Sequence, residues 1–188
     1  MLNDITLCSR ALVRIGAAPI TSFSDGTAES EIAATLYESV RDGLLSAYGW
    51  SFATTQNALT QLAQAPEADY AYAFGLPNDF LRALSAGSNS KSRGVNFRIV
   101  SGALHTNVSA VTLNYIALVD ESTFPPYFAQ ALVARLAAEF CIPVTENTSR
   151  AETLYRLAER EYEQARQIDA QQDSPSAIEN FPLTDIRK

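Results

Sequence analysis

Histidine, cysteine and long apolar runs are scarce in this sequence, and each scarcity disfavours a class of protein. The 188 residues include one His and two Cys. A tetrahedral metal site takes several nitrogen or sulfur ligands, and a disulfide framework takes a larger cysteine set, so both are disfavoured. No apolar run approaches the roughly 20 residues that a membrane helix requires. The first four residues lack the basic start of a secretory signal. We therefore expect no cofactor, no metal and no membrane partner.

Catalytic motifs are missing too. No Gly-Lys-Ser or Gly-Lys-Thr occurs that would mark a phosphate-binding loop. His105 is the only histidine, so any His-dependent triad must include it, and residues 80–119 contain no acid to orient it locally. A more distant acid is left open, but a sheet position for His105 is the simpler interpretation. Cys8 and Cys141 fall on apolar helical faces, which is typical of core packing. The sequence predicts no catalytic residue.

The composition can build a core and is acidic. Hydrophobic residues make up 47% of the chain and charged residues 19%, which argues against a disordered protein. Fourteen Lys and Arg against twenty-one Asp and Glu leave a net charge of −7. A protein of this balance repels nucleic-acid phosphates in general. We expect a folded acidic domain.

One stretch of the chain is basic, although the chain as a whole is acidic. Residues 80–119 contain no acid and four bases, which are Arg82, Lys91, Arg93 and Arg98. A solvated loop is the simplest explanation. The alternatives are contact with an acidic neighbouring subunit or with passing nucleic acid.

Two helices are predicted near the N-terminus. Asn3 and Thr27 are placed to cap them, since both precede apolar residues at helical spacing. Gly16 and Gly49 are placed to end them.

Two more helices are predicted near the C-terminus. Apolar residues recur every four positions over 128–140, and Pro143 is expected to stop that helix. Thr148 or Ser149 is expected to cap the last helix.

Between the helix pairs, the pattern changes to β structure. Ser101-Gly102 indicates a hairpin turn, and residues 85–94 are expected to form an exposed loop. The predicted strands lie within 70–76, 80–84, 96–100, Ala103–Thr106 and 111–118. We expect them to form one small antiparallel sheet.

This order predicts an α+β fold that is mainly α. The N- and C-terminal helices would form a four-helix bundle with the antiparallel β subdomain inserted between them. The expected divisions are residues 1–66 for the N-terminal helices, 67–120 for the β subdomain, 121–172 for the C-terminal helices, and 173–188 for an extended tail.

Aromatic residues on either side of the predicted helix–sheet boundary are expected to form core. Trp50 should be buried between the second helix and the sheet, and Trp50 and Phe52 are close enough in sequence to pack beneath Tyr70, Tyr72 and Phe74. Stacking of these aromatic residues on nucleobases is the weaker alternative, because the residues between them are Ala and Gly rather than Lys or Arg.

Several short motifs, taken in order, resemble the tail tubular protein A group of head–tail connector adaptors of tailed phages, with relatives in gene transfer agents. The resemblance covers roughly residues 5–165. The motifs are Ala11-Leu12-x-x-Ile15-Gly16 with Pro19-Ile20, Phe23-x-Asp25-Gly26-Thr27, Tyr37-x-x-Val40-Arg41-Asp42-x-Leu44-Leu45, Trp50-Ser51-Phe52-Ala53, and Tyr72-x-Phe74-x-Leu76-Pro77-x-Asp79-x-Leu81-Arg82. Of these, Trp50, Phe52, Tyr72, Phe74, Pro77 and Asp79 are interpreted as a structural core motif.

The resemblance implies a structural role in a virion. Such adaptors form a ring, usually of twelve subunits, beneath the portal of a filled head. They join the head to the tail or to a stopper protein, and double-stranded DNA passes through the channel without being read. This implies assembly in the bacterial cytoplasm and a final place at the head–tail junction.

The tail offers a candidate docking segment. Phe181, Pro182, Leu183 and Ile186 alternate with polar residues, a pattern suited to an extended strand in a groove of the portal. An idle tail is the alternative. For the whole chain, the alternatives to an adaptor are an acidic oligomeric binding module outside a virion and, less favoured, a carboxylate-dependent hydrolase.

Overall fold

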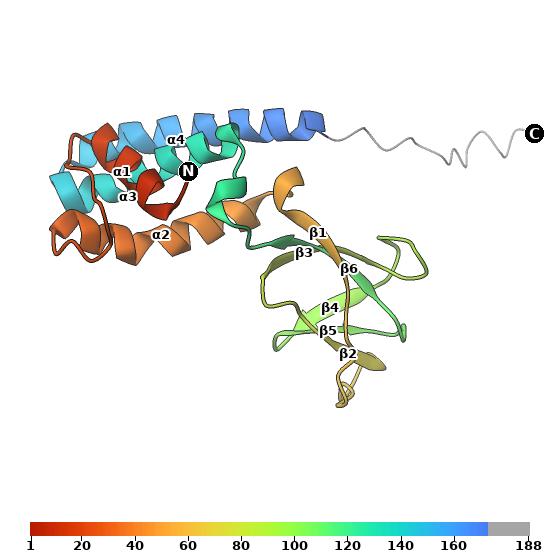
Figure 1. The fold of residues 1–188 in the computed structure, drawn as a ribbon. Helices are drawn as coiled ribbons and strands as arrows, with labels where there is room; N and C mark the ends of the chain where they lie inside the picture. Colours follow the sequence, from red (N-terminus) through yellow and green to blue (C-terminus); the bar gives the residue numbers. More distant parts are fainter. Residues whose placement is uncertain (173–188) are drawn as a thin grey trace, which may run out of the picture.

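A computed structural model describes residues 1–172 and shows an α+β fold in which a helical region and a β region lie side by side (Figure 1). The predictions made above for residues 173–188 lie outside the described residues. The four-helix bundle as such and the divisions at 66, 120 and 172 stay predictions.

The two N-terminal helices are confirmed, together with their caps. Helix α1 is Asp4–Arg14, and the Asn3 side chain accepts a hydrogen bond from the Thr6 N–H. Helix α2 is Ala28–Ala47, and Thr27 forms a reciprocal capping box with the third residue of the helix. Unsatisfied N–H groups at both helix starts thus find partners within three residues in the chain.

The two C-terminal helices differ from expectation at their ends. Helix α3 is Pro126–Thr145, so Pro143 lies inside it and does not stop it. A proline so close to the end removes only one backbone bond, and α3 ends instead at Glu146, which is left-handed with φ 53°. Helix α4 is Thr148–Asp169, capped by Asn147 rather than by either predicted residue.

Helix α3 is the centre of the helical region. It packs against α1, α2 and α4, and its buried residues extend around most of its circumference. It is also the one described helix that is long and apolar enough to cross a membrane, with 61% of its apolar window buried. This corrects the expectation that no segment approaches that length, and packing among three helices accounts for the composition.

The β region contains two three-stranded antiparallel sheets, not the single sheet predicted. Their strand orders are β1-β6-β3 and β2-β5-β4. The strands are β1 (Thr54–Ala58), β2 (Tyr72–Gly75), β3 (Phe80–Gly87), β4 (Phe97–Val100), β5 (Ala103–Thr106) and β6 (Thr112–Ala117). Strand β1 lies outside every predicted strand. It pairs with β6 and draws the chain into the sheet directly after the short helix η1 (Ser51–Ala53).

Turn chemistry explains the hairpin and the end of β3. Ser101 and Gly102 both have positive φ, which is the two-residue turn predicted between β4 and β5. Strand β3 runs to Gly87, three residues into the predicted loop. A Cβ atom at Gly87 would lie 1.8 Å from the Lys91 carbonyl oxygen, so only glycine allows the returning chain this close.

Two apolar cores correspond to the two regions. The helical core also contains Ile116 of β6, whereas Phe74, Leu104 and Tyr115 belong to a separate core within the β region. Val119 packs against both. The chain leaves β6 through the short helix η2 (Glu121–Thr123) and so re-enters the helical region at α3.

Replacing Trp50 tests this packing. Its side chain is fully buried, so Trp50→Ala should lower the free energy of unfolding by about 3–5 kcal/mol through lost contacts and a cavity. Urea denaturation measures the change. Val13→Ala, at a 58% exposed position, is the control and should change stability by less than about 0.5 kcal/mol. A loss below roughly 1 kcal/mol for Trp50→Ala would contradict this packing.

Candidate interaction surfaces

Trp50 is buried, as predicted, and its aromatic neighbours include residues of α3 and α4. Its indole N–H donates to the Leu44 carbonyl at 3.0 Å. Its ring meets Tyr48 and Phe128 edge-on, each with centroids 5.0 Å apart, and Tyr162 at 5.8 Å. Trp50 therefore joins the end of α2 to α3 and α4.

The remaining motif residues divide between the two cores. Phe52 lies 5.0 Å from Phe128 between ring centroids, on the helical side. Tyr72 and Phe74 belong to the β core. The expected stacking of Trp50 and Phe52 beneath them is therefore wrong, because β1 separates the two segments by carrying the chain away from the helices.

Pro77 and Asp79 shape the turn between β2 and β3. The Pro77 carbonyl accepts from the Phe80 N–H at 3.1 Å, and the Asp79 carboxylate accepts from the Tyr115 hydroxyl at 3.0 Å. The Asp79 carbonyl also accepts from the Leu118 N–H at 2.7 Å. These contacts fasten the turn to the end of β6.

A clamp around Glu121 fixes α2 to the start of the C-terminal helices. The Tyr37 hydroxyl donates to the Glu121 carboxylate at 3.0 Å, and the Arg41 guanidinium contacts the same oxygen at 3.0 Å. Arg41 also bonds Asp42 at 2.8 Å. Burial, followed by the Glu121 charge, raises the pKa of Tyr37. The Tyr37 and Arg41 positions of the family-like motif therefore have a structural role.

A second clamp fixes the end of α4. Asp169, only 3% exposed, accepts hydrogen bonds from the Ser51 N–H at 2.9 Å, the Ser51 hydroxyl at 2.8 Å and the Tyr127 hydroxyl at 2.8 Å. Burial and the bond to Asp169 raise the pKa of Tyr127 to about 12. The clamp joins the end of α4 to η1 and to the start of α3.

The four predicted basic residues do not share one element. Arg82 is half-buried in β3, and its Nε has no hydrogen-bond partner within residues 1–172. Lys91 and Arg93 are exposed beside Gly87, five residues or about 16 Å further along β3. Arg98 is exposed on β4 in the other sheet. Their role in subunit or DNA contact stays a prediction.

The structure brings His105 near acids that its local sequence lacks. A surface hollow of about 620 Å³ is lined by residues that include Glu67, Asp69, Arg98 and His105. The His105 ring centroid is 6.5 Å from that of Tyr70, and within residues 1–172 no hydrogen bond orients the imidazole. No group of three His, Cys, Asp or Glu side chains that could hold a metal occurs there either.

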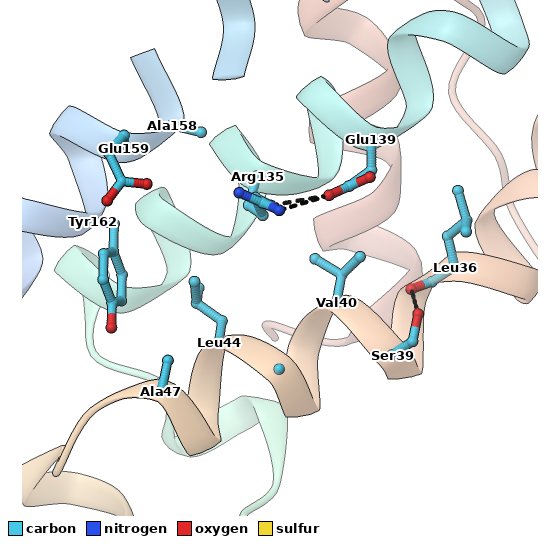
Figure 2. A pocket seen from close by; sticks show the side chains of 11 residues that line it. Leu36, Ser39, Val40, Leu44, Ala47, Arg135, Glu139, Ala158, Glu159 and Tyr162 are labelled. Carbon is cyan, nitrogen blue, oxygen red and sulfur yellow. Dashed lines mark hydrogen bonds and ion pairs between the residues drawn. The ribbon is translucent and has the colours of Figure 1, made fainter. Parts of the chain in front are cut away.

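A second surface hollow lies between α2, α3 and α4 (Figure 2). It encloses about 480 Å³, and its lining includes Val40 and Leu44 of α2, Arg135 and Glu139 of α3, and Glu159 of α4. The Arg135 guanidinium lies 2.9 Å from the Glu139 carboxylate. The hollow thus combines an apolar α2 wall with a charged pair from α3.

Aromatic side chains hold the charges of this hollow in place. The Tyr155 hydroxyl donates to Glu139 at 2.8 Å, and the Arg135 guanidinium lies 5.1 Å from the Tyr155 ring centroid. Burial and the Glu139 bond raise the pKa of Tyr155. At the other end, Arg166 lies over the Tyr48 ring at 4.9 Å.

Gly43 leaves the hollow open on the α2 side. A Cβ atom there would meet nothing within 4 Å, and the residue lies within a regular helix. Glycine at such a position costs about 1 kcal/mol relative to alanine, and no contact in residues 1–172 requires it. Sequence alone does not connect Gly43 with a surface, and it gives no signal for the pairing roles of Glu121, Glu139 and Asp169.

The fold and its surfaces define an α+β module whose motif residues act as structural joints. The family model described as tail tubular protein matches residues 8–177, so the chain belongs to the tail tubular protein family and is a component of a phage virion that assembles with other virion components. This confirms the resemblance. A comparison with curated proteins found no match.

Removing the Asp169 carboxylate should loosen the end of α4. Asp169→Ala leaves three donors without their acceptor and should cost about 3 kcal/mol, measured by urea denaturation. Tyr127→Phe removes one of those bonds and should cost about 1 kcal/mol. Equal losses in the two variants would contradict the shared clamp.

High pH should weaken the fold through its buried tyrosines. The pKa values of Tyr37, Tyr127 and Tyr155 are raised above the ordinary value of 10.0 in the folded state. Their contribution is therefore complete below pH 10 and is lost as pH rises through the folded-state values, about 12 for Tyr127. Denaturation from about pH 8 to about pH 11 should show falling stability. A smaller slope is expected for Tyr127→Phe, and an unchanged slope would contradict its part.

Proposed function

We propose that the chain is a head–tail adaptor that forms a ring under the portal of a phage or phage-like particle. The ring would join the DNA-filled head to the tail and leave a channel for DNA. The carrying observation is the family match over residues 8–177, which covers both regions of the fold. The resemblance supplies the expected number of twelve subunits.

The arrangement of the helices supports an assembly role. We propose that α1 to α4 act as a four-helix bundle from which the β region projects towards a neighbouring ring component. The motif residues join helices to each other, strands to turns and α2 to η2. Such joints suit a rigid building block, and we propose that the chain makes or breaks no covalent bond. Its place would be the head–tail junction, after assembly in the bacterial cytoplasm.

The proposed partners are further copies of the chain, the portal protein, a downstream tail or stopper protein, and double-stranded DNA. The net charge of −7 favours passage of DNA over its retention, because like charges repel. Contact between the portal and Phe181, Pro182, Leu183 and Ile186 is supported by their alternation with polar residues, which suits an extended strand in a groove. The 16 residues that follow Gln172 reach at most roughly 55 Å.

Truncation tests this role. Removing residues 174–188 should leave the fold and its unfolding free energy unchanged, because their sequence lacks helix or strand periodicity, but should abolish attachment to portal-bearing heads. Electron microscopy of particles would show filled heads without tails. The matched variant Phe181→Ser with Leu183→Ser keeps the length and should weaken attachment. Filled heads that still acquire tails would defeat the docking proposal, and absence of the full-length chain from the head–tail junction would defeat the adaptor role.

A further inference from the structure

Helix α4 contacts α3 along a strip of small residues, and the outer part of each of its flanks is exposed. The strip consists of Ala151, Ala158 and Ala165, seven residues apart and all buried. The side chains are small, so α4 lies close to α3, and neither α1 nor α2 packs extensively against α4. Surface hollows occupy both gaps.

The α2–α4 flank is the hollow of Figure 2 together with the acids on the adjoining face of α4. Glu159 lines the hollow, and Glu152 and Glu163 lie seven residues before it and four after it, on the same helical face. All three are exposed, and none forms an ion pair within residues 1–172. Of the arginines near these acids, Arg135 is already paired with Glu139, Arg156 donates to Thr153, and Arg166 lies over the Tyr48 and Tyr162 rings and offsets part of the acidic charge.

The α1–α4 flank presents an exposed apolar side chain and is surrounded mainly by basic rather than acidic residues. Its hollow of about 320 Å³ is lined by Arg14, Ala134, Leu154, Leu157 and Glu161. Leu157 is 47% exposed, so this flank presents a large apolar side chain beside the hollow.

Arginines surround this second flank. Arg150 donates to the Arg14 carbonyl at 3.3 Å, which places the start of α4 beside the end of α1. Arg10 lines the adjoining hollow together with Arg14. The three guanidiniums are exposed and form no ion pair in the described part of the chain, while Glu161 offsets part of their charge.

We propose that the α1–α4 flank of one copy packs against the α2–α4 flank of the next. Leu157 would enter the apolar part of the α2–α4 hollow, which Gly43 keeps open, while Arg10, Arg14 and Arg150 face the acids of α4. The two flanks lie on opposite sides of α4, so every copy offers one of each. Such a contact is head-to-tail and closes into a ring when the rotation per copy fits. The inference rests on the proposed function and names the subunit interface of that ring.

Cross-linking of variants that each carry one introduced cysteine tests this pairing in the full chain. The native Cys8 and Cys141 are fully buried, so an introduced exposed cysteine is the one that a bis-maleimide reaches. Ser39→Cys, in the α2–α4 hollow, mixed with size-tagged Leu157→Cys should give the mixed dimer at least about tenfold over either homodimer, because the contact joins unlike flanks. Glu38→Cys, adjacent in sequence but outside that lining, is the matched control and should give little product. A predominance of either homodimer would overturn the inference.

Two substitutions test the contacts themselves. Gly43→Trp should fill the hollow and reduce the mixed dimer at least about tenfold, whereas Gly43→Ala should leave it unchanged. Arg14→Glu should also reduce it about tenfold by placing like charges together, while the control Arg98→Glu on β4 should not. Thermal unfolding of each variant separates misfolding from lost contact. Full dimer yield from folded Gly43→Trp would contradict the proposal.

Cross-linking within assembled particles distinguishes a wrong interface from a wrong adaptor role. If the chain is present at the head–tail junction but the Ser39→Cys and Leu157→Cys variants do not cross-link to each other within particles, this interface is wrong and the adaptor role stands. If the chain is absent from particles, both the adaptor role and this inference are wrong.

Discussion

The close packing of α3 among α1, α2 and α4 is the constraint on which the rest of the structure depends. Alanines on α3 and α4 let these two axes approach, and larger side chains such as Phe128 and Phe140 fill the space towards the other helices. An apolar helix of 20 residues needs cover on all sides. The alanines let α4 lie close to α3, Leu154, Tyr155 and Tyr162 pack beside them, and the exposed side chains further out on both flanks are what an assembly can use.

Two carboxylates fix the helical region to the segments that enter and leave it. Glu121 lies where the chain returns from the β region, and Asp169 lies where it leaves α4. Each is held by a tyrosine hydroxyl and by a second group from elsewhere in the sequence. Hydrogen bonds to a buried charge are stronger than neutral ones, and their geometry is specific. These bonds thereby fix η2 to α2, and the end of α4 to η1 and to the start of α3.

Local signals predicted the helices well and the sheets less well. Asn3 and Thr27 act within a few residues, so their caps can be recognised in the sequence. Strand β1 has the composition Thr-Thr-Gln-Asn-Ala, which carries no apolar alternation, and it becomes a strand because β6 provides its partner. The division into two sheets and the helical surroundings of Trp50 likewise depend on long-range pairing. The same is true of the hollows: Leu36 and Glu159 are 123 positions apart, and no local pattern brings them together.

Gly43 and Leu157 are the two residues on which the proposed contact between copies depends most directly. Gly43 is a glycine within a helix, which lowers helix stability, and Leu157 is a large apolar side chain that is 47% exposed. The two lie on opposite flanks of α4, one leaving a space and the other offering a side chain of suitable size. In the proposed contact, Leu157 of one copy would fill the space beside Gly43 of the next, and the arginines of one flank would lie near the acids of the other, so that contact between copies would satisfy both flanks at once.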